Sequence, residues 1–565
     1  MFCTRSRLLK KVTVLARAYA RSRISRKLAM CSGERDKQYN EAVETLNGLQ
    51  TNASVLEKVS KSATGQRRSR ELHEVVTFLK RIGLETSNLD QLNAIHVTGT
   101  KGKGSVCAMS ERILRAYGLK TGFYSSPHLR EVRERIRLNG RPLSKPQFVE
   151  NFWEVYNKLS SSKEDYGGVM PPYFRFLTVM AFNVFLKEKV DVAVIEVGIG
   201  GTFDTTNVIP NPVVCGIASL GLDHVELLGD TLEKIAWQKG GICKRGHPAF
   251  TMPQDPGPLG VLQERAKELE ALPLEVAPEL GEYPGEEPVL ALAGEHQKMN
   301  ASLAAQLCRS WLQIKGMWSD LGQDAQAEKR HLHGVPVAQP FPLTPQFYEG
   351  LREVRWPGRN QIIKRERVTY YVDGAHTPKS IETSAEWFME VSAKEAEALT
   401  ESTVRVLIFN ITGKRINRTD VFLRPLVDCG FDYALFAPNI ADVDGAHSAD
   451  QTNLTVTKDT MLDCVRMNES TWRKLATEQC VKNGQSHNLD DNTYHNDHVA
   501  TSDQLKTRVF ASLREAVNWC TVDCHGEYYP QNLKDSSIHV QVLVTGSLHL
   551  AGAFMSVLDI NVDES

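Results

Sequence analysis

The chain lacks any uninterrupted apolar run near the 18 or so residues that a membrane-spanning helix needs. It has 11 cysteines but no paired C-x-x-C motifs, so we expect reduced, mostly buried thiols rather than disulfides or zinc ligands. The formal net charge is only −1, so no overall field draws the protein to nucleic acid or to a membrane surface. Any site for an anionic ligand must therefore be local.

Acidic residues are missing from the first 33 positions, where six arginines and three lysines are mixed with serines and apolar residues. This composition is typical of a cleaved mitochondrial presequence. A basic arm for nucleic acid is the alternative, but the interspersed apolar residues favour targeting. Met30 lies at the end of the segment and offers a second start, which predicts a cytoplasmic form beside the mitochondrial one.

A glycine-rich segment, residues 99–105 with the sequence GTKGKGS, follows an apolar run that ends at Val97 and precedes a helical pattern. Glycines let the backbone N–H groups turn toward an anion, and a lysine and the helix N-terminus add positive charge. The segment therefore predicts a nucleoside triphosphate site, although a purely structural glycine turn is the alternative. The common P-loop has a glycine where Val97 stands, and its hydroxyl residue comes one position before Ser105, which weakens a plain kinase or NTPase interpretation.

Strand and helix patterns alternate along the chain, which predicts an α/β fold with mostly parallel sheets. A chain of 565 residues is longer than a single hydrophobic core usually accommodates, so we expect more than one domain. The pattern indicates an N-terminal P-loop-type ATP-binding domain at 34–350, after a presequence at 1–33, and a smaller C-terminal Rossmann-like α/β domain at 351–565. Residues 316–350 are polar and proline-bearing and are predicted to be a connector. Further strands are predicted at 120–124, 191–197, 213–218, 289–293, 368–373, 404–410, 433–437 and 539–545, and helices at 173–186, 231–238, 297–312 and 379–391.

Residues 439–502 interrupt the second domain with a polar stretch that we interpret as a disordered insertion. The spacing of its histidines fits no metal template. These histidines are His447, His487, His495 and His498.

Seven further short motifs follow the glycine-rich segment, and they share an order along the chain. They are YSSPHL at 124–129 with RERI at 133–136, EVGIGG at 196–201 with DTTN at 204–207, LDH at 222–224, GEHQ at 294–297, WPGR at 356–359, DGAHTP at 373–378 and, more weakly, GSLHL at 546–550. Together they resemble the folylpolyglutamate synthases, a family within the Mur-type ATP-dependent amide ligases. One departure is at Gly413-Lys414-Arg415, where the family usually continues with aspartate and this chain has Ile416.

The resemblance implies ATP-dependent addition of L-glutamate to the γ-carboxyl of tetrahydrofolate and its polyglutamates through an acyl phosphate. It implies ATP, Mg²⁺ and a monovalent cation as ligands, and a monomer in the mitochondrial matrix, with association to the inner membrane, and in the cytoplasm. Nucleic acid is not among the expected partners. The alternatives are a dihydrofolate synthase-type ligase that adds the first glutamate to dihydropteroate, a P-loop NTPase or kinase, and a nonenzymatic nucleotide- or folate-binding scaffold.

For two residues, physical arguments predict a functional role independently of the resemblance. Lys103 at a helix start opposes the helix dipole unless an anion is present. Glu196 ends a buried strand, where an isolated carboxylate is costly unless a cation pairs with it. The resemblance implies phosphate contacts for Gly102, Lys103, Gly104 and Ser105, Mg²⁺ contacts for Ser126, Glu196 and His224, and nucleotide contacts for His296, Gln297, Asn300, Arg359 and Asp373.

Lys239 and His376 join Lys103 as the catalytic residues that the resemblance implies. Lys239 would be carbamylated and support a second magnesium ion, and His376 would help to seat glutamate or the acyl phosphate. The sequence itself leaves other roles open: Lys239 fits a lysine that pairs with a helix C-terminus, and His224 and His376 fit ordinary loop histidines.

Overall fold

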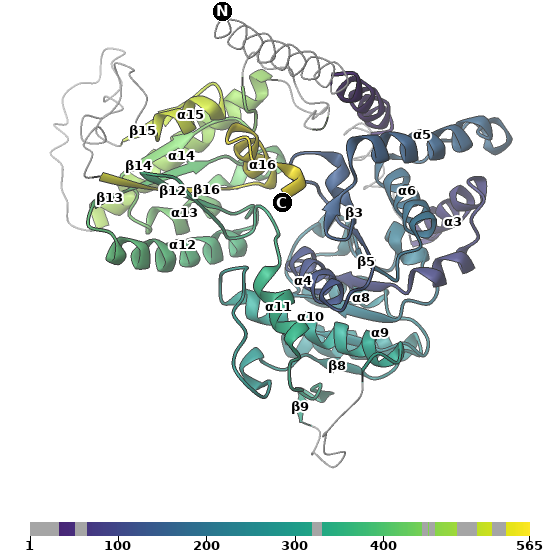
Figure 1. Cartoon of the computed structure of the whole chain (residues 1–565). Helices are drawn as coiled ribbons and strands as arrows, with labels where there is room; N and C mark the ends of the chain where they lie inside the picture. Colours follow the sequence, from purple (N-terminus) through teal and green to yellow (C-terminus); the bar gives the residue numbers. More distant parts are fainter. Residues whose placement is uncertain are drawn as a thin grey trace, which may run out of the picture.

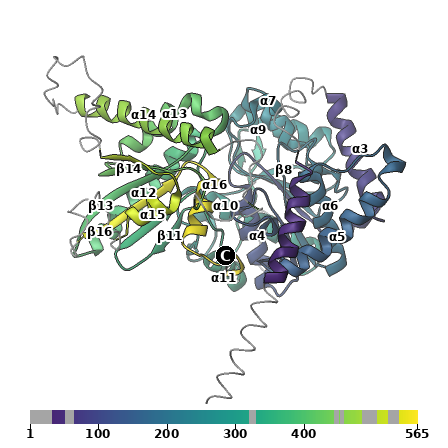
Figure 2. The same cartoon turned by 90° about the horizontal axis from the view of Figure 1, so that it is seen from above.

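The computed structural model describes residues 33–50, 65–318, 330–442, 450, 458–482, 506–521 and 538–564. Its elements form two lobes that lie side by side, each built around its own sheet (Figures 1 and 2). The predicted α/β class with mostly parallel sheets is confirmed. The predicted presequence lies outside the described residues except for Gly33, and the predicted domain boundaries stay predictions.

The first lobe holds an eight-stranded sheet in the order β4-β3-β2-β5-β1-β6-β7-β8, parallel except at β3 and β4. Alternate residues of its central strands enter opposite cores: Val192 and Val194 face one, and Ala193 and Ile195 the other. Its strands are β1 Ile95–Thr98, β2 Thr121–Tyr124, β3 Ile136–Leu138, β4 Arg141–Pro142, β5 Val192–Glu196, β6 Val214–Ile217, β7 Ala249–Thr251 and β8 Leu274–Val276.

Helices cover both faces of this sheet. One face packs against α4 Lys103–Ala116, α10 His296–Ile314 and α11 Pro345–Glu353. The other packs against a helix at 33–47 and α3 Gly65–Arg81, α5 Lys145–Ser161, α6 Tyr173–Glu188, α8 Leu232–Gly240 and α9 Pro256–Glu268, with the short α7 Val225–Leu228 before α8.

The second lobe holds a six-stranded sheet in the order β11-β12-β16-β13-β14-β15, in which only β11 pairs antiparallel. One face packs on α15 and α16, and the other on α12, α13 and α14. The strands are β11 Gln361–Lys364, β12 Val368–Val372, β13 Ser402–Phe409, β14 Tyr433–Phe436, β15 Thr507–Val509 and β16 Ile538–Thr545. The helices are α12 Pro378–Ala398, α13 Thr419–Val427, α14 Lys458–Lys482, α15 Leu513–Trp519 and α16 Leu548–Val557.

The predicted disordered insertion at 439–502 is wrong in part. It contains α14, which buries Val465, Trp472 and Leu475 against the sheet, so its few apolar residues complete a core. Asp450 of the same insertion accepts a 2.7 Å hydrogen bond from the hydroxyl of Tyr39 in the first lobe. The four histidines noted in this insertion lie outside the described residues.

Two other predictions for the first lobe are wrong. Residues 289–293 do not form the predicted strand. The segment pairs with no strand of the described sheets, and the side chain of Val289 is 71% exposed. The connector predicted at 316–350 includes β9 His331–Leu332, β10 Val335–Pro336 and the start of α11, which packs Phe347 into the core beside α4. Proline at the start of α11 begins a helix here and does not interrupt one.

No helix in the part of the chain that the structure describes is long and apolar enough to cross a membrane. The seven cysteines whose side chains are described are all free and buried, as expected for reduced thiols.

Candidate active site

The glycine-rich loop connects β1 to α4 at the carboxyl edge of the first sheet, where parallel α/β sheets bind ligands. Gly102 has a φ of 82° and precedes the first residue of α4. A Cβ atom on Gly102 would lie 2.3 Å from the Oδ1 of Asn300, and one on Gly104 would lie 2.9 Å from the ring of Trp356. Backbone conformation and a close neighbour both favour glycine at position 102, whereas at position 104 the indole of Trp356 is the reason.

The ammonium of Lys103 lies over this loop. Its Nζ donates to the carbonyl oxygens of Gly99 at 3.0 Å and Thr100 at 3.4 Å. This geometry holds a cation at the N-terminal end of α4, where the helix dipole is also positive. Ser105 is buried in the first turn of the same helix. The predicted phosphate-binding residues are therefore neighbours in one loop-to-helix junction.

Lys239 in the last turn of α8 reaches the same loop. Its buried Nζ donates to the carbonyl of Gly99 at 2.6 Å. Burial, followed by the charge of Lys103, lowers the pKa of Lys239 well below that of an exposed lysine. The amine is therefore held toward its neutral, nucleophilic form.

Glu196 ends β5, the strand that lies directly beside β1 in the sheet. Its carboxylate is buried and accepts a 3.1 Å hydrogen bond from the backbone N–H of Ser126, which follows β2. Burial raises the pKa of Glu196, although the charges of Lys103 and Arg359 oppose the shift. Two of the three predicted magnesium ligands therefore meet at one strand edge.

His224, the third predicted ligand, lies at the exposed rim just before α7, with a φ of 49°. Loss of hydration lowers its pKa, opposed by the charge of Asp223, and the charges of Lys103 and Lys239 act in the lowering direction. A neutral imidazole is the form that can bind a metal. Among the described residues, His, Cys, Asp and Glu side chains form no group of three or more around one point, so any metal here needs ligands from the substrate or solvent as well.

The start of α10 lies beside the loop. The Nδ2 of Asn300 donates to the Oε1 of Gln297 at 2.8 Å, and the Nε2 of Gln297 lies 3.2 Å from the Nε2 of His296. Gln297 and Asn300 are buried, whereas His296 is exposed. The contact between Asn300 and the loop at Gly102 brings this predicted nucleotide group to the phosphate-binding residues.

The second lobe contributes Arg359 and Asp373 to the same region. Asp373 is buried and accepts 3.0 Å hydrogen bonds from the N–H groups of Asn360 and Ala375. Burial raises its pKa, and the charge of Arg359 opposes the shift. Burial also lowers the pKa of Arg359, whose charge is felt by both Asp373 and Glu196. Arg359 is therefore influenced by the charge of one carboxylate in its own lobe and one in the other lobe.

His376 is the other cross-lobe residue. Its Nε2 accepts a 3.0 Å hydrogen bond from the Nζ of Lys101, so its Nδ1 carries the proton and donates to the carbonyl of Gly374 at 2.9 Å. Burial, followed by the charge of Lys101, lowers the pKa of His376 to about 3. The imidazole is therefore neutral at physiological pH.

Three residues near this edge, Lys101, Asp223 and Trp356, carry no role in the sequence interpretation. Lys101 pairs with Asp223 at 3.5 Å, and Trp356 packs against Gly104 and lies 5.1 Å from the guanidinium of Arg137. All three stand within the motifs quoted above, so the signal was present, but their meaning depends on contacts between segments far apart in the chain. The loop at 413–415, which lacks the family aspartate, also faces the site, because the charge of Arg415 lowers the pKa of both His376 and His224.

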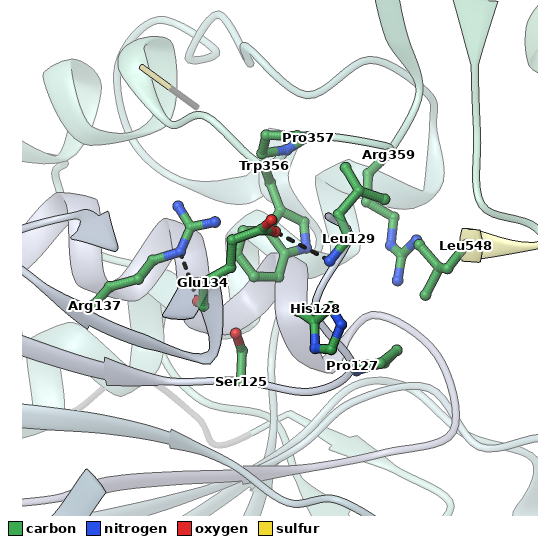
Figure 3. Close-up of a pocket in the computed structure, with 10 residues that line it drawn as sticks. All are labelled: Ser125, Pro127, His128, Leu129, Glu134, Arg137, Trp356, Pro357, Arg359 and Leu548. Atoms are coloured by element: carbon green, nitrogen blue, oxygen red, sulfur yellow. Dashed lines mark hydrogen bonds between the residues drawn. The ribbon is translucent and has the colours of Figure 1, made fainter. Parts of the chain in front are cut away.

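Figure 3 shows a pocket between the lobes next to this edge. The side chains of Arg137 and Glu134 from the first lobe face Arg359 and Leu548 from the second, with Trp356 of the linking segment between them. The remaining lining residues are Ser125, Pro127, His128, Leu129 and Pro357.

Two lobes built on mostly parallel sheets, which meet at a glycine-lysine loop and a buried carboxylate, are consistent with the Mur ligase-like fold. The chain is 46% identical to the mitochondrial folylpolyglutamate synthase of Bos taurus, and the match covers 93% of each chain. It is 44% identical to the mitochondrial folylpolyglutamate synthase of Homo sapiens, over 93% of this chain and 92% of that one. The chain belongs to the folylpolyglutamate synthase family.

Solved structures share the fold. A Mycobacterium tuberculosis folylpolyglutamate synthase complexed with ADP has a TM-score of 0.63 at 22% identity, covering 93% of this chain and 99% of that one. A folylpolyglutamate synthase complex with AMPPCP and folate has a TM-score of 0.57 at 22% identity, covering 90% of this chain and 100% of that one. No protein-family model matches the chain.

Proposed function

We propose that this protein uses ATP to add L-glutamate to the γ-carboxyl of tetrahydrofolate and of its polyglutamates. The observation that carries the proposal is a gathering of cations at the phosphate loop. Lys103 and Lys239 both donate to the carbonyl of Gly99, and the charges of Lys103 from the first lobe and Arg359 from the second act on the buried carboxylate of Glu196. Such a set of cations suits the transfer of a charged phosphoryl group. The relatives of the same family at 44–46% identity support the assignment of the substrates.

The reaction requires an activated acid, because a carboxylate would have to expel oxide when an amine attacks it. A carboxylate oxygen first attacks the γ-phosphorus of ATP, and the bond from that phosphorus to the β-γ bridging oxygen breaks with release of ADP. The amine of glutamate then attacks the acyl carbon to give a tetrahedral intermediate. Inorganic phosphate leaves with the electron pair of the C–O bond, and the amine proton passes to solvent.

The loop residues bind and orient the triphosphate in this scheme. Backbone N–H groups at Gly102 and Gly104, with the hydroxyl of Ser105, are placed to bind phosphate oxygens. Lys103 then exchanges the carbonyls of Gly99 and Thr100 for the β- and γ-phosphates, as a cation at a helix N-terminus is suited to do. Arg359 neutralises charge on the transferring group from across the cleft.

Magnesium fits the residues at the strand edge. Glu196 is a buried carboxylate with one protein hydrogen bond from Ser126 among the described contacts, and hard oxygen ligands are what Mg²⁺ prefers. Ser126, Glu196 and His224 would hold the ion, which would offset negative charge on the phosphates when bound. A neutral amine reacts with CO₂, so the lowered pKa of Lys239 fits its conversion to a carbamate, an anion that could face a second magnesium ion.

We assign each of the remaining predicted residues either to binding of the nucleotide or to binding of the other substrates. His296, Gln297 and Asn300 would contact the base and ribose, which is supported by their hydrogen-bonded contacts with one another and by the contact of Asn300 with the loop at Gly102. Asp373 orients the backbone of the Arg359 segment through Asn360. His376, which is neutral, would seat glutamate or the acyl phosphate by hydrogen bonding rather than by charge.

Relatives named mitochondrial and the basic leader support a mitochondrial location. Within the mitochondrion, we propose the matrix, with association to the inner membrane. A start at Met30 would give a cytoplasmic form. We further propose a monomer that uses a monovalent cation and does not bind nucleic acid.

Mass spectrometry of folate products tests the function. Purified protein with tetrahydrofolate, ATP, Mg²⁺ and L-glutamate should give products heavier by successive glutamyl residues. Extension of dihydropteroate alone would identify a dihydrofolate synthase-type ligase. ATP hydrolysis without any glutamyl product would identify an NTPase, and neither activity would leave a binding scaffold.

A further inference from the structure

The segment that follows Ser126 is held in a fixed shape by one buried carboxylate. Glu134 accepts hydrogen bonds from three successive N–H groups, those of Leu129 at 3.0 Å, Arg130 at 2.9 Å and Glu131 at 2.7 Å. Three such bonds to one carboxylate leave the segment little freedom to move by itself. We call residues 129–131 the clasp.

The second lobe rests directly on the clasp through α16. A Cβ atom on Gly552 would lie 1.8 Å from the carbonyl oxygen and 2.8 Å from the carbonyl carbon of Leu129, so helix and clasp touch backbone to backbone. A Cβ atom on Gly358 would lie 3.1 Å from the side chain of the same leucine. The clasp therefore sets how closely the two lobes approach at this point.

Arginines in and beside the clasp also bind the C-terminal segment, from Ser556 near the end of α16 to Asp563. Arg130 donates to the Oγ of Ser556 at 3.0 Å and to the carbonyl of Ile560. Arg133 pairs with Asp563 and donates to the carbonyl of Leu143 at 3.0 Å. Both views of the molecule place the C-terminus at the boundary between the lobes (Figures 1 and 2).

Gly374 lies against both the same helix and the guanidinium of Arg359 in the second lobe. A Cβ atom on Gly374 would lie 2.4 Å from Leu548, the first residue of α16, and 2.6 Å from Arg359. Figure 3 shows Leu129, Leu548 and Arg359 beside one another in the wall of the pocket. A shift of α16 away from the clasp would therefore change the position of Arg359 relative to Ser126 and Glu196.

We propose that Gly552 and Arg130 are positioning residues for the ligation reaction: through the contact of α16 with the clasp, they fix the separation of the lobes at which Arg359 reaches the phosphate site. This inference rests on the proposed function. It gives the C-terminal segment a role in the chemistry although none of its residues touches the phosphate loop among the described contacts.

The test compares two glycine-to-alanine changes in helices. Gly552→Ala inserts a Cβ against backbone atoms, whereas Gly260→Ala in α9 meets nothing within 4 Å. Since a misplacement of about 1 Å can cost roughly 10²-fold in rate, we expect kcat for glutamate addition to fall by up to that factor in Gly552→Ala and to stay unchanged in Gly260→Ala. Gly260→Ala should keep the wild-type melting temperature, because alanine itself favours a helix. Gly552→Ala should melt lower, because its methyl group weakens the contact between the lobes, and circular dichroism should show that both proteins are folded.

Small-angle X-ray scattering with AMPPCP and tetrahydrofolate provides a readout that does not depend on turnover. The radius of gyration should be larger for Gly552→Ala than for Gly260→Ala. If both alanine proteins have the same rate and the same radius, the inference is wrong. If wild-type protein makes no glutamyl product, the proposed function fails, and the scattering comparison still decides whether the contact sets the lobe separation.

If Gly552→Ala does not fold, Arg130→Ala tests the same positioning role. It removes the hydrogen bonds to Ser556 and to the Ile560 carbonyl without adding bulk. We expect a several-fold lower kcat with a KM for ATP close to that of wild type, since the phosphate loop belongs to the first lobe. Full kcat in Arg130→Ala would overturn the proposal.

Discussion

The Nζ of Lys101 lies 3.0 Å from the Nε2 of His376, and this hydrogen bond joins the phosphate loop of the first lobe to the start of α12 in the second. Burial lowers the pKa of Lys101 to about 8, opposed by the charge of Asp223. The pair therefore connects the two halves of the site through a lysine whose charge is held less firmly than that of an exposed lysine.

Lys101→Met should weaken this connection. The Nε2 of His376 would lose its donor, and an acceptor left unpaired in a cleft costs about 1–3 kcal/mol. We expect kcat/KM for glutamate addition to fall roughly tenfold, as measured by incorporation of labelled glutamate. Lys298→Ala, which removes a lysine paired only at the surface, serves as the control and should keep full activity. Equal rates for the two variants would show that the bond is dispensable.

Lys103→Ala should abolish glutamate addition while the fold is retained. Removing a cation that faces developing phosphoryl charge costs roughly 10²–10³-fold in kcat, by analogy with the loss of an oxyanion donor. Among the described residues, the Nζ bonds only to backbone carbonyls of its own loop, so little stability depends on it. Circular dichroism and a thermal melt check the fold. Near-normal activity in a folded Lys103→Ala protein contradicts the phosphate role.

Glu196→Gln should impair magnesium-dependent activity without lowering the stability of the fold. The amide keeps an oxygen for the N–H of Ser126 but removes a charge whose pKa burial raises. An ionised group with a raised pKa destabilises the folded state at neutral pH, so the neutral variant should melt at the same temperature or higher.

The same variant should need more magnesium for half-maximal rate. A titration of rate against Mg²⁺ in wild type and in Glu196→Gln measures this shift. An unchanged magnesium requirement would remove Glu196 from the proposed metal site.

Lys239 should carry a carbamate in the presence of bicarbonate. Its lowered pKa supplies the neutral amine that reacts with CO₂. Carbon-13 NMR of protein equilibrated with labelled bicarbonate should show a carbamate resonance that is missing from Lys239→Ala. The inactive alanine variant should also recover part of its rate with added short-chain carboxylates. Identical spectra from both proteins would disprove the modification.

Stability should fall in mild acid because of His96. This histidine is fully buried in β1, its Nε2 lies 2.8 Å from the hydroxyl of Thr206, and burial lowers its pKa to about 3. The unfolded chain takes up the proton near pH 6.5, whereas the folded protein does not until about pH 3, so this contribution to stability is complete above pH 6.5 and is lost progressively between those values.

Urea unfolding at pH 7.5 and pH 5 tests whether the free energy of unfolding falls as the pH is lowered. The His96 contribution to the free energy of unfolding should drop by about 2 kcal/mol between those pH values. His96→Gln should show a correspondingly smaller drop. A larger drop in the glutamine variant would mean that another group controls the acid sensitivity.

Local patterns in the sequence predicted most of the elements around the site. The buried strand ending at Glu196 and the helix that follows the glycine-rich loop both appear where hydrophobic periodicity places them. The strand at 289–293 failed because a short apolar run can lie on the surface when no neighbouring strand pairs with it. Helix α14 was missed because its core-facing residues are few and lie within a polar composition.

By itself, the sequence determined the α/β class, the phosphate-type loop and the residue types at the strand ends, because these depend on periodicity and on glycine and lysine spacing within short segments. Only the tertiary structure decided that Lys101 meets His376, that α16 rests on Leu129 and that Arg359 faces Glu196. These contacts join residues more than 150 positions apart, and they depend on how two separately folded lobes pack together, which no local pattern encodes.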